Sequence, residues 1–77
     1  MTQRLEIDCL GMKCPRPIIE IAKAARKVPP GSTLEIRADD LAFESDVKAW
    51  AENADAAILG LEKNGKEVWV ELKLKRG

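Results

Sequence analysis

Four segments of the sequence alternate apolar and polar residues, and each of them is apolar on one side only. They are residues 4–9, 33–38, 57–63 and 67–75. This two-residue period is typical of a strand that buries one face and exposes the other. Strands of a sheet covered on both faces would be apolar throughout. We therefore expect one sheet with a polar, uncovered face and an apolar face that packs against helices.

Two segments between these strands have the periodicity of helices. The first begins at Pro15 and should end firmly at Pro29-Pro30-Gly31. The second follows Asp39 and Asp40, two residues that favour a helix N-cap. The predicted apolar stripes are Ile18, Ile19, Ala22, Ala25 and Arg26 in the first helix and Phe43, Val47, Trp50, Ala51 and Ala54 in the second.

The order of these elements, βαβαββ, defines the fold of a single domain over residues 1–77. The right-handed crossover rule makes the first two strands parallel. Asn64-Gly65 indicates a hairpin between the last two strands, with Leu61 opposite Val68. We predict a two-layer α/β sandwich in which a four-stranded mixed sheet carries both helices on one face.

The composition argues against several function classes. Thirteen basic and thirteen acidic residues cancel, so nothing indicates direct binding to nucleic acid. The chain has no histidine, which excludes a His-based triad or a His-rich metal site within one chain. No segment is apolar enough to span a bilayer and no signal peptide is visible, so we expect no membrane association. We expect a cytoplasmic protein in which Cys9 and Cys14 are reduced.

Cys14 stands where the first helix begins. If Pro15 is the first helical residue, Cys14 is the N-cap, where the helix dipole and the charges of Lys13 and Arg16 favour a thiolate. Pro15 and Pro17 lack N–H groups, so Arg16 is the expected backbone donor to the sulfur. No cysteine follows three residues later, which excludes a Cys-x-x-Cys dithiol. A single activated sulfur without a base suits a carrier that accepts a group, such as the sulfane sulfur of a persulfide, and passes it on.

Cys9 is a different kind of cysteine. It shares a strand face with Leu5 and Ile7, so we expect its side chain in the core. The alternative is a disulfide or an auxiliary sulfur relay between Cys9 and Cys14.

The remaining polar and aromatic features have simple explanations. Helix capping and solvation explain the acidic residues near the second helix better than a cation site does, and we predict no metal and no cofactor. Trp69 falls on the polar face of the sheet. We expect a monomer, and the alternative is a dimer that forms through this face. The acidic residues concerned are Asp39, Asp40, Glu44 and Asp46.

Two blocks make the chain resemble the TusA/SirA-like sulfur-carrier family. Cys14-Pro15-Arg16-Pro17 matches the family's Cys-Pro-x-Pro at the start of the first helix. Asp39-Asp40-Leu41-Ala42, followed by Asp46, matches a second block that typically reads Asp-Asp-Pro-Ala. The likeness covers residues 5–75 and implies the βαβαββ sandwich, with a persulfide carried on Cys14.

The chain departs from the family pattern at two positions. Leu41 replaces the usual proline, which should loosen the start of the second helix. Cys9 stands where the members that serve tRNA thiolation commonly have alanine. The resemblance therefore leaves the pathway open between tRNA thiolation, cofactor sulfuration and sulfur metabolism.

The resemblance also implies partners. A cysteine desulfurase or a rhodanese-like protein would donate the sulfur to a carrier without independent turnover, and a downstream acceptor protein would take it. We expect both partners to dock where the two helices begin, with Met12 as the apolar anchor. The alternative is a thiol-independent interaction or regulatory module. The residues predicted to bind or position are Gly11, Met12, Lys13, Pro15, Arg16, Pro17 and Asp40.

Overall fold

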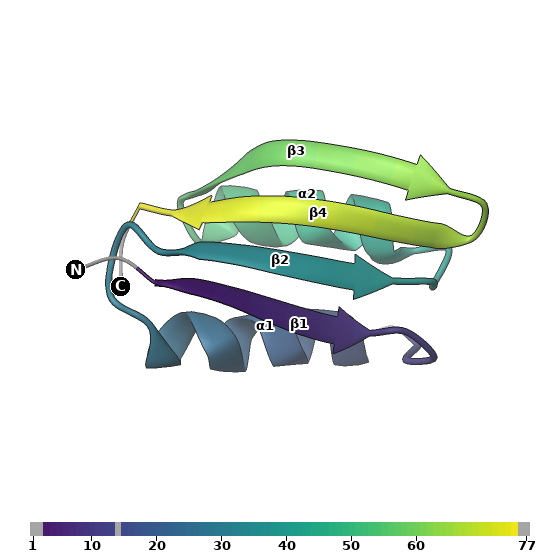
Figure 1. Ribbon diagram of the computed structural model, residues 1–77, viewed down its shortest axis with the longest axis horizontal. Helices are drawn as coiled ribbons and strands as arrows, with labels where there is room; N and C mark the ends of the chain where they lie inside the picture. Colours follow the sequence, from purple (N-terminus) through teal and green to yellow (C-terminus); the bar gives the residue numbers. More distant parts are fainter. Residues whose placement is uncertain (1–2, 14, 76–77) are drawn as a thin grey trace.

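The computed structural model describes residues 3–13 and 15–75, and its elements follow the predicted order (Figure 1). Within these residues four strands form one mixed sheet in the order β1-β2-β4-β3. Strands β1 and β2 are parallel, as the crossover rule predicts, and β4 runs antiparallel to both β2 and β3. The elements are β1 Arg4–Cys9, α1 Arg16–Lys27, β2 Thr33–Ala38, α2 Phe43–Asn53, β3 Ala56–Asn64 and β4 Glu67–Leu74.

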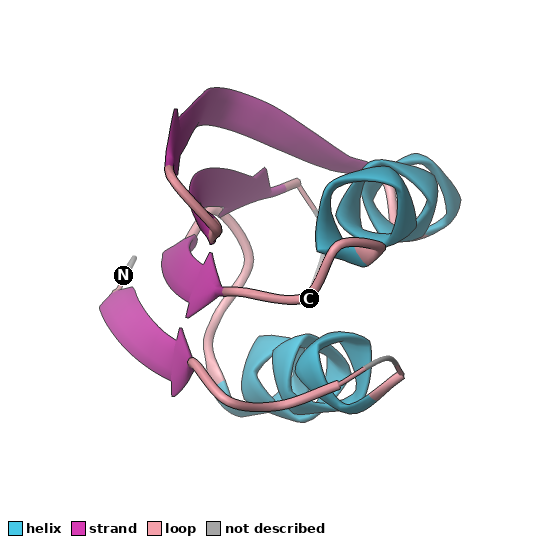
Figure 2. Cartoon of the chain, turned by 90° about the vertical axis from the view of Figure 1, so that its right-hand side faces the viewer, coloured by secondary structure: helices cyan, strands magenta, loops and turns pink. Residues whose placement is uncertain are grey.

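Both helices cover the same face of the sheet, which confirms the predicted two-layer sandwich (Figure 2). The core lies between the layers. In β2 every second side chain is buried, namely Leu34, Ile36 and Ala38. Strand β4 contributes Val68, Val70, Leu72 and Leu74 in the same way. This one-sided burial is the dominant favourable contribution to folding.

The uncovered face of the sheet carries charged side chains. Glu35 on β2 lies opposite Glu71 on β4, a like-charge pair that would weaken the sheet if it stood alone. Arg4 on β1 forms ion pairs with both carboxylates, and its Nη2 lies 3.1 Å from Oε2 of Glu71. Trp69 lies beside Gly60 on this face, where a Cβ on the glycine would stand 3.5 Å from the ring.

The buried stripe of α1 differs from the prediction. Its buried side chains are Pro17, Ile21 and Ala24, whereas Ile19 is 46% exposed and Arg26 is exposed. The prediction treated Pro17 only as a helix-start residue. It therefore placed the apolar stripe of α1 on a neighbouring side of the helix. In α2 the buried residues are three of those predicted, Phe43, Val47 and Ala51.

The β3–β4 hairpin has a different register from the predicted one. Leu61 lies opposite Val70, and Lys63 lies opposite Val68. The two central residues of the turn are therefore Gly65 and Lys66, and of these Gly65 alone has a positive φ, +64°. This is the requirement of a type II′ turn, in which glycine takes the first central position. The displacement at Leu61 is even, so Leu61 still packs against the core. Leu59 does not share that face, because it lies at the bulge between Ile58 and Gly60 and is 54% exposed.

We expect the turn to depend on Gly65 and not on Asn64. Replacing Gly65 by alanine forces a side chain into a left-handed conformation and should lower the free energy of unfolding by about 1 kcal/mol. Asn64→Ala should change it by less than about 0.5 kcal/mol, because Asn64 is exposed and needs no positive φ. Urea denaturation of both variants measures the difference. Equal losses would instead indicate a type I′ turn centred on Asn64-Gly65.

Candidate functional site at the starts of the two helices

The predicted site lies at one end of the sheet. Because β1 and β2 are parallel and each is followed by a helix, both helix starts lie at the same end, as expected (Figure 1). Two loops at this end lead into the helices, residues 10–15 between β1 and α1 and residues 39–42 between β2 and α2, and the turn of the β3–β4 hairpin lies at the same end (Figure 1). Cys14, the predicted reactive residue, lies outside the described residues.

The loop after β1 is a compact turn. The N–H of Leu10 donates to the Asp8 carboxylate at 3.0 Å, and the N–H of Met12 donates to the Cys9 carbonyl at 3.1 Å. Gly11 has a φ of +82°, which confirms it as the pivot of the loop. A Cβ on Gly11 would meet no atom within 4 Å, so its conformation and not its size calls for glycine.

Asp39 ties the two loops together. Its Oδ1 accepts a hydrogen bond from the N–H of Gly11 at 3.0 Å, across 28 positions of sequence. Asp39 follows the last residue of β2, and Ala38 lies opposite Cys9, the last residue of β1. Parallel pairing therefore places the carboxylate beside the turn. The sequence analysis explained Asp39 by helix capping or solvation and missed this contact, although the predicted parallel pairing of the first two strands already placed their ends side by side.

The start of α1 lies one residue later than predicted. The helix begins at Arg16, with Pro15 and not Cys14 at the N-cap. The N–H of Arg16 donates to the Lys13 carbonyl at 2.9 Å, and the predicted bond from this N–H to the sulfur of Cys14 falls outside the described residues. Pro17 is buried in the core and anchors the first turn, whereas Lys13, Pro15 and Arg16 are exposed. The prolines therefore have different roles, because only Pro17 packs.

The first turn of α1, residues 16–19, contains no acidic residue. The partial positive charge of the helix start and the cationic side chains of Lys13 and Arg16 therefore act in the same direction on nearby groups. An environment of this kind stabilises a thiolate, the form in which cysteine is a nucleophile and accepts transferred sulfur. These residues flank Cys14 in the sequence.

The start of α2 also differs from the prediction. The helix begins at Phe43 with Ala42 at the N-cap, and no side chain caps it, so capping by Asp39 or Asp40 is wrong. The carbonyl of Asp40 accepts a hydrogen bond from the Phe43 N–H at 3.1 Å. The turn through residues 41–42 separates the aspartate side chains from the helix start, and Asp39 bonds to Gly11 instead. Asp40 Oδ2 is enclosed and has no hydrogen-bond partner in the described part of the chain.

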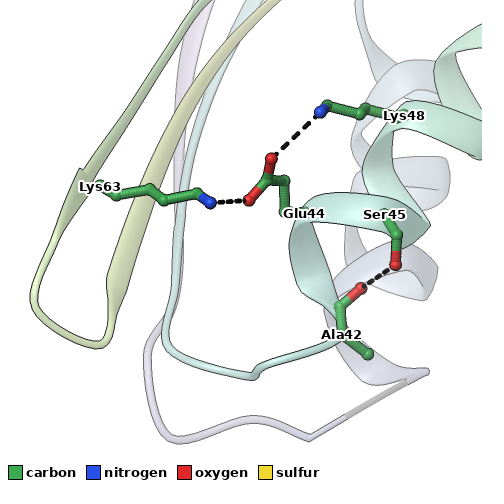
Figure 3. Close-up of polar contacts among 5 residues, drawn as sticks. All are labelled: Ala42, Glu44, Ser45, Lys48 and Lys63. Carbon is green, nitrogen blue, oxygen red and sulfur yellow. Dashed lines mark hydrogen bonds and ion pairs between the residues drawn. The ribbon is translucent and has the colours of Figure 1, made fainter.

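The first turn of α2 is fixed to the end of β3 by charge (Figure 3). Glu44 forms ion pairs with Lys63 on β3 and with Lys48 one turn along α2, the latter at 3.0 Å. Hydrogen bonds from Lys63 and Lys48 lower the pKa of the Glu44 carboxyl. The Ser45 hydroxyl donates to the Ala42 carbonyl at 3.3 Å. These exposed contacts are individually weak, and of them only the bond from Ser45 reaches the loop that carries Asp39.

Cys9 is confirmed as a core residue. Its side chain is 0% exposed, and its thiol is free. Burial raises the pKa of this thiol, and the carboxylates of Glu20 and Asp8 raise it further. Cys9 is therefore a neutral, enclosed thiol at neutral pH, poorly suited to nucleophilic attack.

The described side chains form no group of three or more His, Cys, Asp or Glu residues that could hold a metal ion. Neither helix of the described part is long and apolar enough to cross a membrane.

Two comparisons with known proteins bear on this site. Residues 5–76 match the family model described as Sulfurtransferase TusA. The chain is also 33% identical over 66 residues to a Bacillus subtilis (strain 168) protein named "Putative sulfur carrier protein YrkF". The aligned part is 86% of this chain but 36% of that protein, so the chain spans little more than a third of that relative's length.

We expect the tie between the loops to depend on Asp39 alone. Asp39→Ala removes the acceptor for the Gly11 N–H, so exchange of that amide with solvent should speed up about fivefold, the equivalent of about 1 kcal/mol. Asp40→Ala is the matched control, because it removes a neighbouring carboxylate that accepts no bond from Gly11. Amide exchange followed by NMR measures both variants. The same Gly11 exchange rate in both would contradict the role given to Asp39.

Proposed function

The chain belongs to the TusA family of sulfurtransferases, and on that premise we propose that it is a sulfur carrier that holds a persulfide on Cys14. The observation that carries the proposal is the setting of this residue. The family match spans it, and its neighbours Lys13, Pro15 and Arg16 are exposed cationic or proline residues at a helix start. Such a setting favours a thiolate and leaves room for a partner.

Loading is a thiol exchange onto Cys14. Its thiolate attacks the terminal sulfur of a persulfide on the donor protein, a new S–S bond forms, and the donor's own S–S bond breaks as its cysteine leaves as a thiolate. No external oxidant or reductant is needed, because the sulfane sulfur moves in the same oxidation state. Delivery repeats the step, with a thiolate of the acceptor attacking the terminal sulfur and Cys14 leaving.

The other features of the chain suit a carrier. There is no histidine to act as a general base, and the exchange requires none once the attacking group is a thiolate. Cys9, the other cysteine of the chain, is enclosed in the core with a raised pKa, which disfavours its attack on a persulfide at Cys14. A persulfide on Cys14 would therefore persist until a partner arrives.

Family membership supports a donor that is a cysteine desulfurase or a rhodanese-like protein, and a downstream acceptor protein. The pathway is one of tRNA thiolation, cofactor sulfuration or sulfur metabolism. Because the thiol must stay reduced, we place the protein in the cytoplasm, and we propose that it acts as a monomer without a metal or cofactor. Gly11, Asp39 and Pro17 would hold the loop and the helix start on either side of Cys14.

We expect sulfur to load on Cys14 and not on Cys9. Incubation with a cysteine desulfurase and L-cysteine should add about 32 Da per sulfur to the Cys14 peptide, measured by mass spectrometry under non-reducing conditions. Cys9→Ser is the matched control and should keep loading, whereas Cys14→Ser should abolish it. Loading that survives Cys14→Ser and disappears with Cys9→Ser would overturn the assignment.

A further inference from the structure

Leu41 is the most exposed large apolar side chain of the described residues. It is 96% exposed, in the loop between β2 and α2. One exposed leucine does not by itself indicate a binding surface, because apolar atoms make up much of any protein surface. Leu41, however, lies in the same loop as Asp39, at the end of the sheet where both helices begin.

A second exposed leucine lies on the loop that leads to Cys14. Leu10 is 38% exposed, and the next residue, Gly11, is tied to Asp39 by the 3.0 Å hydrogen bond. Asp39 is two residues before Leu41. The tie thus joins the two loops that present these leucines at the end of the sheet that faces the viewer in Figure 2.

Charges of both signs lie at the same end, where the carboxylates of Asp8 and Asp39 accept hydrogen bonds from backbone N–H groups of the first loop. Lys13 and Arg16 are exposed, and within residues 3–13 and 15–75 neither takes part in an ion pair. A surface that combines exposed leucines with free cations is complementary to an apolar recess bordered by carboxylates. The expected apolar anchor, Met12, does not fit as well, because it is half-buried and packs against the core.

We propose that Leu41, supported by Leu10, is the anchor through which a sulfur-donor protein recognises this chain. This inference rests on the proposed sulfur-carrier function. The donor is the partner specified, because the proposed loading step requires its persulfide to reach Cys14 at the end of the sheet that presents these leucines. The donor's surface beside its own persulfide would carry an apolar recess that admits Leu41, with acidic residues at its border to face Lys13 and Arg16.

The test distinguishes a loss of docking to the donor from a loss of reactivity at Cys14. Leu41→Gln keeps a side chain of similar size without adding charge near Cys14, and Leu59→Gln is the matched control. Leu59 is 54% exposed, but it lies at the bulge in β3, the edge strand at the other side of the sheet from β1. Each protein is loaded by a cysteine desulfurase with L-cysteine and, separately, by inorganic polysulfide, which needs no docking.

We expect Leu41→Gln to raise the concentration of chain needed for half-maximal loading by the desulfurase about tenfold, the scale of one apolar side chain lost from an interface. Loading by polysulfide should stay unchanged, and Leu59→Gln should change neither. Unchanged loading of Leu41→Gln by the desulfurase overturns the docking proposal and leaves Cys14 as the carrier.

Three other outcomes would each overturn a part of the proposal. A parallel loss of polysulfide loading in Leu41→Gln would mean that Leu41 supports the loop, which overturns docking. A wild-type chain that polysulfide loads and the desulfurase does not would likewise overturn recognition of this donor. No loading of the wild-type chain by either route would overturn the sulfur-carrier function itself.

Discussion

The parallel pairing of β1 with β2 is the constraint on which the rest of the structure depends. Each strand leads into a helix, so pairing them in parallel brings both helix starts to one end of the sheet. The same pairing sets Cys9 beside Ala38 and lets the Asp39 carboxylate reach the N–H of Gly11. This strand register therefore buries Cys9 in the core. It also ties the loop that carries Cys14 to the loop between β2 and α2.

Much of the fold followed from the sequence because one-sided burial leaves a clear two-residue period. The pattern predicted β2 at Thr33–Ala38 to the residue, and the crossover rule predicted its direction relative to β1. The hairpin register did not follow, because Asn64-Gly65 fits two turn types. Gly65 has a positive φ in both of them, and they differ in Asn64, whose φ is not positive in this structure. The stripe of α1 was displaced because Pro17 acts both as a helix-start residue and as a core residue.

Some single residues of the candidate site were predictable, and the contacts between its loops were less so. The pivot at Gly11 and the enclosed thiol of Cys9 follow from local patterns, and both are confirmed. The contact of Asp39 with Gly11 joins residues 28 positions apart, so it needs the strand register as well as the motif. The exposure of Leu41 depends on where α2 begins, two residues later, which propensity alone places poorly.

We propose that the helix start and its cations activate Cys14, whereas burial keeps Cys9 unreactive. The alkylation rate of each cysteine as a function of pH is the sharpest test of this difference. Peptide-resolved iodoacetamide labelling of the folded chain should give Cys14 a pKa below the ordinary value of about 8.5 and leave Cys9 almost unlabelled. Charge reversal of Lys13 and Arg16 together should raise the pKa of Cys14 and leave Cys9 unchanged. A Cys14 pKa at or above the ordinary value, or faster labelling of Cys9 than of Cys14, would show that the two cysteines do not differ in this way.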